Sequence, residues 1–182
     1  CVIHWFRKGL RFHDNPALLA AVNYSNINNL HFIPIFILDP DYHNKSYKIG
    51  ANRWKFLHQS LTDLDEKFRN LHDNRLHVIQ GAPVDVISKL INDYNVKCIT
   101  FEIETEPYAK SRDQKVIELC KKLNVEVVTK LSDQIKNDTR CAKDKEYEYV
   151  MDANAIMCGR SSRSIKFIDQ YPGLIALVEE FS

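Results

Sequence analysis

Three glutamates at alternate positions, Glu102, Glu104 and Glu106, form the densest group of side chains that could do chemistry. An extended backbone would point all three carboxylates the same way, and their mutual repulsion would favour protonation of one, as acid–base catalysis requires. Alternatively, a cation such as Arg112 neutralises one carboxylate while the others contact solvent or another domain. The second interpretation is favoured, and the first stays open.

A basic stretch with Arg7, Lys8 and Arg11 follows the first apolar run. These side chains could be solvated loop charges, or they could form salt bridges and the edges of a pocket. The adjoining His13-Asp14-Asn15 invites a catalytic interpretation. Because Asn15 precedes Pro16 and a run of helix formers, a helix N-cap is the better prediction.

Several common catalytic and binding motifs are absent from the sequence. Gly9 stands alone after the first apolar run, and neither GxGxxG nor GxxxxGK[ST] occurs, which argues against nicotinamide-dependent dehydrogenases and P-loop enzymes. The five cysteines include no CxxC pair, and the histidines lack metal-ligand spacing. We therefore expect no metal site, no structural zinc and a reducing compartment.

Short apolar runs alternate with longer helical patterns, which is typical of parallel sheets flanked by helices. Strands are predicted at residues 2–6, 30–38, 75–79, 96–101 and 125–129. Helices are predicted from Pro16 and at residues 52–71, 83–94 and 107–123. The expected fold is α/β, a doubly wound five-stranded parallel sheet with helices on both faces. It is Rossmann-like but has no dinucleotide fingerprint.

The predicted helix at residues 52–71 has one apolar face. Its apolar side chains recur every three or four positions at Trp54, Leu57, Leu61, Leu64, Phe68 and Leu71. Trp54 is accordingly predicted to be a core residue, buried against the sheet. Because doubly wound sheets bind ligands beyond the carboxyl ends of their strands, functional residues are expected in the loops that follow each strand.

Three sequence blocks resemble one known family. They are HWFRKGLRFHDNPAL from His4, ANRWKFL with the downstream QSLTDLDEKFR from Ala51, and FEIETEPY from Phe101 with Arg112-Asp113. In order and spacing these blocks are similar to the N-terminal α/β domain of cryptochromes and photolyases, especially animal cryptochromes and (6-4) photolyases. The similarity extends to about Ser132.

The resemblance implies an antenna-chromophore or partner-binding pocket between the strand ends. The matching positions are Arg7, Lys8, Asp39, Pro40, Tyr42, Glu106, Ala109 and Arg112. Folate-type sites of the family carry Asn-Glu where Tyr108-Ala109 stands here, so the resemblance favours a deazaflavin, a flavin or an empty pocket. No residue of this chain is predicted to be catalytic.

In the full-length parent, the resemblance implies FAD bound in a C-terminal helical domain. The parent would be a DNA photolyase that repairs damaged DNA with light, or a cryptochrome that contacts clock and signalling proteins, in the nucleus or cytoplasm. The isolated chain is predicted to be inactive. The alternatives are a stand-alone nucleotide-binding α/β protein and a truncated isoform that acts only as an interaction module.

Composition sets the limits on these predictions. The 182 residues are 45% hydrophobic with a formal net charge of +1, which describes one globular domain without a general basic excess for nucleic acid. We expect an α/β domain at residues 1–131 and an unassigned linker with a short helical tail at 132–182. No membrane segment is apparent, and the start at Cys1 suggests a fragment.

Overall fold

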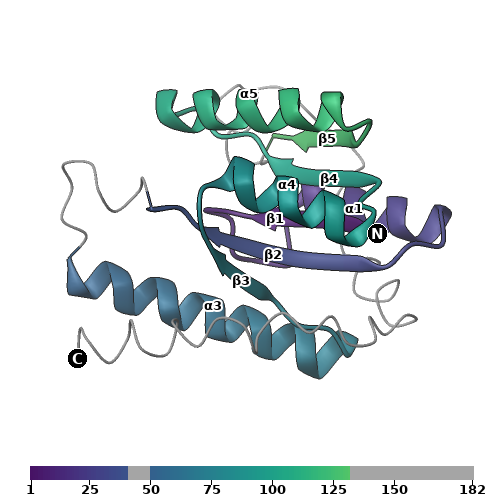
Figure 1. Cartoon of the computed structure of the whole chain (residues 1–182). Helices are drawn as coiled ribbons and strands as arrows, with labels where there is room; N and C mark the ends of the chain where they lie inside the picture. The colour runs from purple at the N-terminus through teal and green to yellow at the C-terminus, as the bar shows by residue number, and fades with distance from the viewer. Residues whose placement is uncertain (41–49, 132–182) are drawn as a thin grey trace, which may run out of the picture.

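Strands and helices alternate along the chain in the computed structural model, which describes residues 1–40 and 50–131 (Figure 1). The elements are β1 (Val2–Phe6), α1 (Pro16–Ile27), β2 (Phe32–Leu38), α3 (Ala51–His72), β3 (His77–Gln80), α4 (Pro83–Tyr94), β4 (Cys98–Glu102), α5 (Pro107–Lys122) and β5 (Glu126–Lys130). No helix in this part of the chain is long and apolar enough to cross a membrane. The predicted tail at 132–182 lies outside the described residues.

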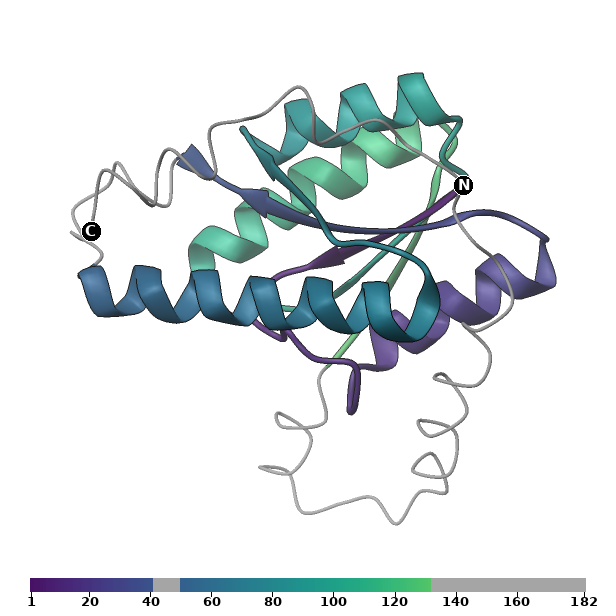
Figure 2. The same ribbon diagram turned by 90° about the horizontal axis from the view of Figure 1, so that it is seen from below.

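All five strands pair in parallel in the order β3-β2-β1-β4-β5. Figure 2 shows α1 and α3 on one face of this sheet and α4 and α5 on the other. The predicted doubly wound fold is therefore confirmed: β1 has the predicted bounds, and no strand boundary is shifted by more than two residues. The strand order reverses between β1 and β4, and the loops at this point diverge to opposite faces.

Each face of the sheet buries its own set of apolar side chains. On one face Ile3, Ile35 and Ile99 pack against Ile87 of α4 and Val116 of α5. The other face is covered by α1 and α3, whose buried apolar residues include Leu18, Val22, Leu61, Leu64 and Phe68. Burial on both faces explains why the sequences of the inner strands β1, β2 and β4 are almost continuously apolar.

Local signals fix where the helices begin. The Asn15 side chain accepts a hydrogen bond from the backbone nitrogen of Leu18 at 2.9 Å, which confirms the predicted N-cap of α1. Pro16, Pro83 and Pro107 each open a helix, where their missing N–H group costs no helical hydrogen bond.

The apolar face of α3 differs from the prediction at both ends. Leu61, Leu64 and Phe68 are buried, but Trp54 is only half-buried and Leu71 is 53% exposed. A helix of 22 residues is about 33 Å long, whereas a strand of five to seven residues spans only about 17 to 23 Å. The first turns of α3 therefore extend past the strand ends (Figure 1). The prediction that Trp54 is a core residue was wrong.

Candidate functional site

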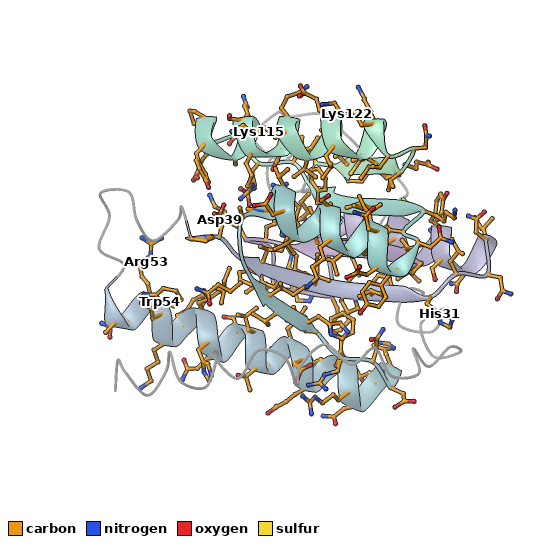
Figure 3. All side chains as sticks on the ribbon, in the orientation of Figure 1. His31, Asp39, Arg53, Trp54, Lys115 and Lys122 are labelled. Atoms are coloured by element: carbon orange, nitrogen blue, oxygen red, sulfur yellow. The ribbon has the colours of Figure 1, made fainter. Side chains whose placement is uncertain are left out.

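A cavity of about 460 Å³ lies at the carboxyl ends of β1 and β2, beside the first turns of α3 and α5. Figure 3 shows Asp39, Arg53 and Trp54 at this end of the sheet and His31 at the opposite end. The apolar part of the wall includes Trp5, Phe6, Phe36, Trp54 and Leu57. The cavity thus occupies the region beyond the strand ends where doubly wound sheets bind ligands.

The cavity brings together most of the residues predicted from the sequence. Its lining includes Arg7, Lys8, Asp39, Glu106, Ala109 and Arg112. Pro40 follows Asp39 directly but does not line the cavity. Tyr42 lies outside the described residues. That the six lining residues bind a ligand remains a prediction.

Arg7, from the loop after β1, and Arg112, from α5, meet at one buried carboxylate. Asp113 Oδ1 accepts hydrogen bonds from Arg7 Nη1 at 2.5 Å and from Arg112 Nε and Nη2 at 3.1 Å each. Arg112 Nη2 also donates to Glu104 Oε2 at 3.3 Å. Because the Arg7 side chain is only 6% exposed, Arg7 is not a solvated loop charge. Because two carboxylates neutralise the two guanidinium groups, the ion pairs offset the cost of removing these charges from water.

Aromatic rings complete the surroundings of these two arginines. The guanidinium carbons of Arg7 and Arg112 each lie 4.9 Å from the Trp5 ring centroid, and that of Arg7 lies 4.7 Å from the Phe101 ring. Cation–π contacts of this length add to the ion pairs. The two guanidinium groups are therefore held in fixed orientations at the cavity wall, before any ligand arrives.

Each of the three alternating glutamates has a basic neighbour. The ion pairs are Glu102 with Arg11 at 3.8 Å, Glu104 with Arg112 at 3.3 Å and Glu106 with Lys8 at 2.5 Å. The pairs of Glu102 and Glu106 join the loop after β1 to the end of β4 and the loop that follows it, and the pair of Glu104 joins that second loop to α5. Arg112 neutralises one carboxylate, Glu104, as the favoured interpretation expected, but Glu102 and Glu106 also have cations beside them and do not contact solvent alone.

Gly9 lies between the residues that form these pairs. A Cβ atom at this position would overlap the carboxylate of Glu102 and approach Arg11 Nη1 to 3.1 Å. The backbone of the first loop therefore comes as close to Glu102 as a glycine allows. This close approach lets Arg7 Nη2 reach the backbone carbonyl of Glu102 as well.

The mouth of the cavity is formed by aromatic and polar side chains from three elements. The hydroxyl of Tyr108, in the first turn of α5, donates a hydrogen bond to Asp39 Oδ2 at 2.6 Å, and the Tyr108 ring is 39% exposed. Trp54, Phe56 and Arg53 line the cavity from α3.

Sequence reasoning missed Asp113 as the residue that holds both arginines. The buried residues of α5 are Ala109, Asp113, Val116 and Cys120, at spacings of four, three and four. An aspartate on the buried face of an amphipathic helix requires a cation within reach, so this pattern would have revealed it. The pairing of Tyr108 with Asp39 had no comparable sequence signal, because the two residues are far apart in the chain.

The residues present fit a flat conjugated ligand. The cavity volume lies within the roughly 300 to 1,000 Å³ of small-molecule sites, and the wall is mainly apolar with polar groups at the edges. Trp54 and Tyr108 offer aromatic faces, and Arg112 offers N–H donors to carbonyl oxygens at a ring edge. Within residues 1–40 and 50–131, no group of His, Cys, Asp or Glu side chains suits a metal ion.

Comparison with known proteins shows a single family. The sequence profile of the DNA photolyase family matches residues 2–150, which runs past the domain boundary expected at residue 131. Cryptochrome-2 of Gallus gallus is 44% identical over 135 residues, and cryptochrome-1 of Erithacus rubecula is 41% identical over 130 residues. These matches cover 74% and 71% of this chain but only 22% and 20% of the two relatives.

Solved structures agree with the sequence matches. An archaeal photolyase from Sulfolobus tokodaii, described with two FAD molecules that imply a novel light-harvesting cofactor, superposes with a TM-score of 0.64 at 28% identity. A cryptochrome from Synechocystis gives the same TM-score at 27% identity. Each match covers 71% of this chain, and 29% and 27% of the respective structures. The chain therefore belongs to the DNA photolyase family, together with the cryptochromes, and has the fold of that family's N-terminal α/β domain.

Proposed function

We propose that the cavity binds the planar ring of an antenna chromophore, a flavin or a deazaflavin, within a photolyase or cryptochrome parent. The observation that carries this proposal is the pair of buried guanidinium groups, fixed by Asp113 beside aromatic walls. The light-harvesting cofactor described for the Sulfolobus tokodaii photolyase supports it.

Different side chains of the cavity would contact different parts of the ring. Trp54 and Tyr108 would pack against the faces of the ring, while Arg112 would donate hydrogen bonds to oxygen atoms at its edge. A bound chromophore of this kind supplies absorption of visible light. The protein would fix its orientation and keep water away from it.

The activity of the longer parent forms a second level of the proposal, because this chain spans only 20 to 22% of its curated relatives. We propose a parent that holds FAD in a C-terminal helical domain and either repairs damaged DNA or signals through partner proteins, in the nucleus or cytoplasm. The antenna would pass its excitation energy to that FAD. By itself the chain is proposed to have no repair activity.

A titration of the purified chain with FMN tests the binding proposal. Arg112→Ala removes a charge-assisted hydrogen bond worth about 1.5 to 3 kcal/mol, so it should weaken FMN binding by roughly tenfold to a hundredfold. Lys115→Ala removes an exposed cation from the same helix and serves as the matched control (Figure 3). Circular dichroism should show that both variants are folded.

Two results would contradict the antenna proposal. One is the absence of FMN binding at millimolar concentration, and the other is an unchanged affinity in the folded Arg112→Ala variant. Contact with a partner protein would then be the better-supported function of the same surface. Phe56, which is 72% exposed at the cavity mouth, favours that second candidate, because large exposed aromatic side chains are typical of contact surfaces.

A further inference from the structure

A phenol and a carboxylate are hydrogen-bonded in the cavity wall. This pair could take part in electron and proton transfer, which ligand binding alone does not require. Tyr108 and Asp39 both line the cavity, and the Tyr108 hydroxyl donates to Asp39 Oδ2 at 2.6 Å. This distance is typical of a charge-assisted O–H···O⁻ hydrogen bond. The proton of the phenol is thus already directed at a base.

Phenols lose an electron easily when the proton has somewhere to go. A tyrosine that loses one electron becomes a strong acid, so electron loss and proton loss occur together where a hydrogen-bonded base can accept the proton. Carboxylates are such bases, and transfer along an existing hydrogen bond needs almost no movement of heavy atoms. Tyr108 and Asp39 therefore form a preassembled donor of one electron and one proton.

We propose that Tyr108 and Asp39 make the cavity photochemically active toward an oxidised flavin, in addition to holding it, so that in the parent this electron transfer competes with the passage of excitation energy to FAD. When the bound flavin absorbs light, Tyr108 gives one electron to the excited ring and its hydroxyl proton to Asp39. The products are a neutral tyrosyl radical, a protonated Asp39 and a flavin that carries one extra electron. Return of the electron and the proton restores the starting state. The inference rests on the proposed binding of a flavin.

The two tryptophans of the cavity wall, Trp5 and Trp54, must be compared with Tyr108 as electron donors to the flavin. Trp5 has the guanidinium groups of Arg7 and Arg112 at 4.9 Å from its ring, and two cations so close oppose the positive charge that an oxidised indole would carry. Trp54 is the competing donor, because its half-buried ring also lines the cavity. The test must therefore separate Tyr108 from Trp54.

The experiment measures the fluorescence lifetime of FMN bound at saturation to the chain and to its variants. Tyr108→Phe keeps the ring and removes the transferable proton, so the lifetime should lengthen several-fold. Asp39→Asn removes the proton acceptor and should lengthen it in the same direction. Trp54→Phe tests the competing donor and should lengthen the lifetime less than Tyr108→Phe does. Lys115→Ala, an exposed position on the same helix as Tyr108, should leave the lifetime near the wild-type value. Transient absorption of the wild-type chain should show a neutral tyrosyl radical that is missing in Tyr108→Phe.

Heavy water and the ligand-free chain provide two independent measurements. Deuterated solvent should lengthen the lifetime of FMN in the wild-type chain but not in Tyr108→Phe, because only the first reaction moves a proton. Without ligand, Asp39→Asn should change the tyrosine absorption near the red edge of its band, since the Tyr108 hydroxyl loses its anionic acceptor.

Each contrary result has a separate meaning. If FMN binds and its lifetime is unchanged in Tyr108→Phe, the photochemical inference is overturned while the binding proposal stands. If only Trp54→Phe lengthens the lifetime, the electron comes from the indole and the inference is equally overturned. If FMN does not bind at all, the proposed function fails, and the inference fails with it.

Discussion

The two halves of α3 carry the same apolar spacing but have different environments. In the second half Leu61, Leu64 and Phe68 are buried against the sheet. In the first half Trp54 and Leu57 are half-buried and line the cavity. The difference teaches that an apolar helix face is not always a core face. Where a helix extends past the strands, the same pattern makes the wall of a binding site.

The largest expected effect is in the second half of this helix. Phe68 is fully buried and contacts the rings of Phe6, Phe12 and Phe32, so Phe68→Ala should lower the free energy of unfolding by about 3 to 5 kcal/mol. Urea denaturation followed by circular dichroism measures it. Phe56→Ala, at an exposed position of the first half, is the control and should cost no more than about 0.5 kcal/mol. Equal losses in the two variants would remove the distinction between the halves.

An intermediate effect is expected from acid. Burial lowers the pKa of His72. Below about pH 6.5 the His72 imidazole therefore binds a proton in the unfolded chain but stays neutral in the folded chain. The stability present above pH 6.5 is therefore lost as the pH falls, by up to about 1.4 kcal/mol per pH unit for this histidine. Urea midpoints between pH 8 and pH 5 should decrease less steeply in His72→Gln.

The matched control for acid sensitivity is His58→Gln, at an exposed position of the first half of α3. It should reproduce the wild-type slope. His4 and His77 add to the same slope, because burial lowers their pKa values to about 3 and about 4, so His72→Gln reduces the dependence without removing it. A His72→Gln curve parallel to the wild-type curve would contradict the stated role of burial.

A smaller effect on stability than at Phe68 is expected at Trp54. Because its ring lies over the cavity and not in the core, Trp54→Ala should cost only about 1 kcal/mol of unfolding free energy. The same variant should weaken FMN binding several-fold, since the ring supplies a face for stacking. Paired denaturation and titration of one protein preparation would measure both. If Trp54→Ala lowered the free energy of unfolding as much as Phe68→Ala does, Trp54 would have to be a core residue, contrary to this interpretation.

Much of the fold could be predicted from local sequence signals. Continuous apolar runs identified the strands, since both faces of the sheet are covered, and Pro16, Pro83 and Pro107 marked the starts of helices. The alternation of these elements indicated a parallel sheet. The position of the cavity at the carboxyl edge of the sheet then followed from topology, and six of the eight residues that the family resemblance implied line it.

The features that could not be predicted depend on lengths and on distant contacts. Periodicity predicts which side of α3 is apolar, but it contains no information on where the sheet beneath it ends, and so Trp54 was misplaced. The contact of Tyr108 with Asp39 forms only when the ends of β2 and α5 meet in three dimensions. For Asp113, the signal was present in the helical spacing but was not used.

The different positions of Trp5 and Trp54 give the chain two built-in optical reporters. Trp5 is shielded from water beneath the guanidinium groups of Arg7 and Arg112, whereas Trp54 is partly exposed at the mouth of the cavity. A shielded indole emits at shorter wavelengths than a hydrated one. The blue part of the emission would therefore follow unfolding of the sheet, while the red part, and its quenching by iodide or acrylamide, would follow occupancy of the cavity in the folded chain.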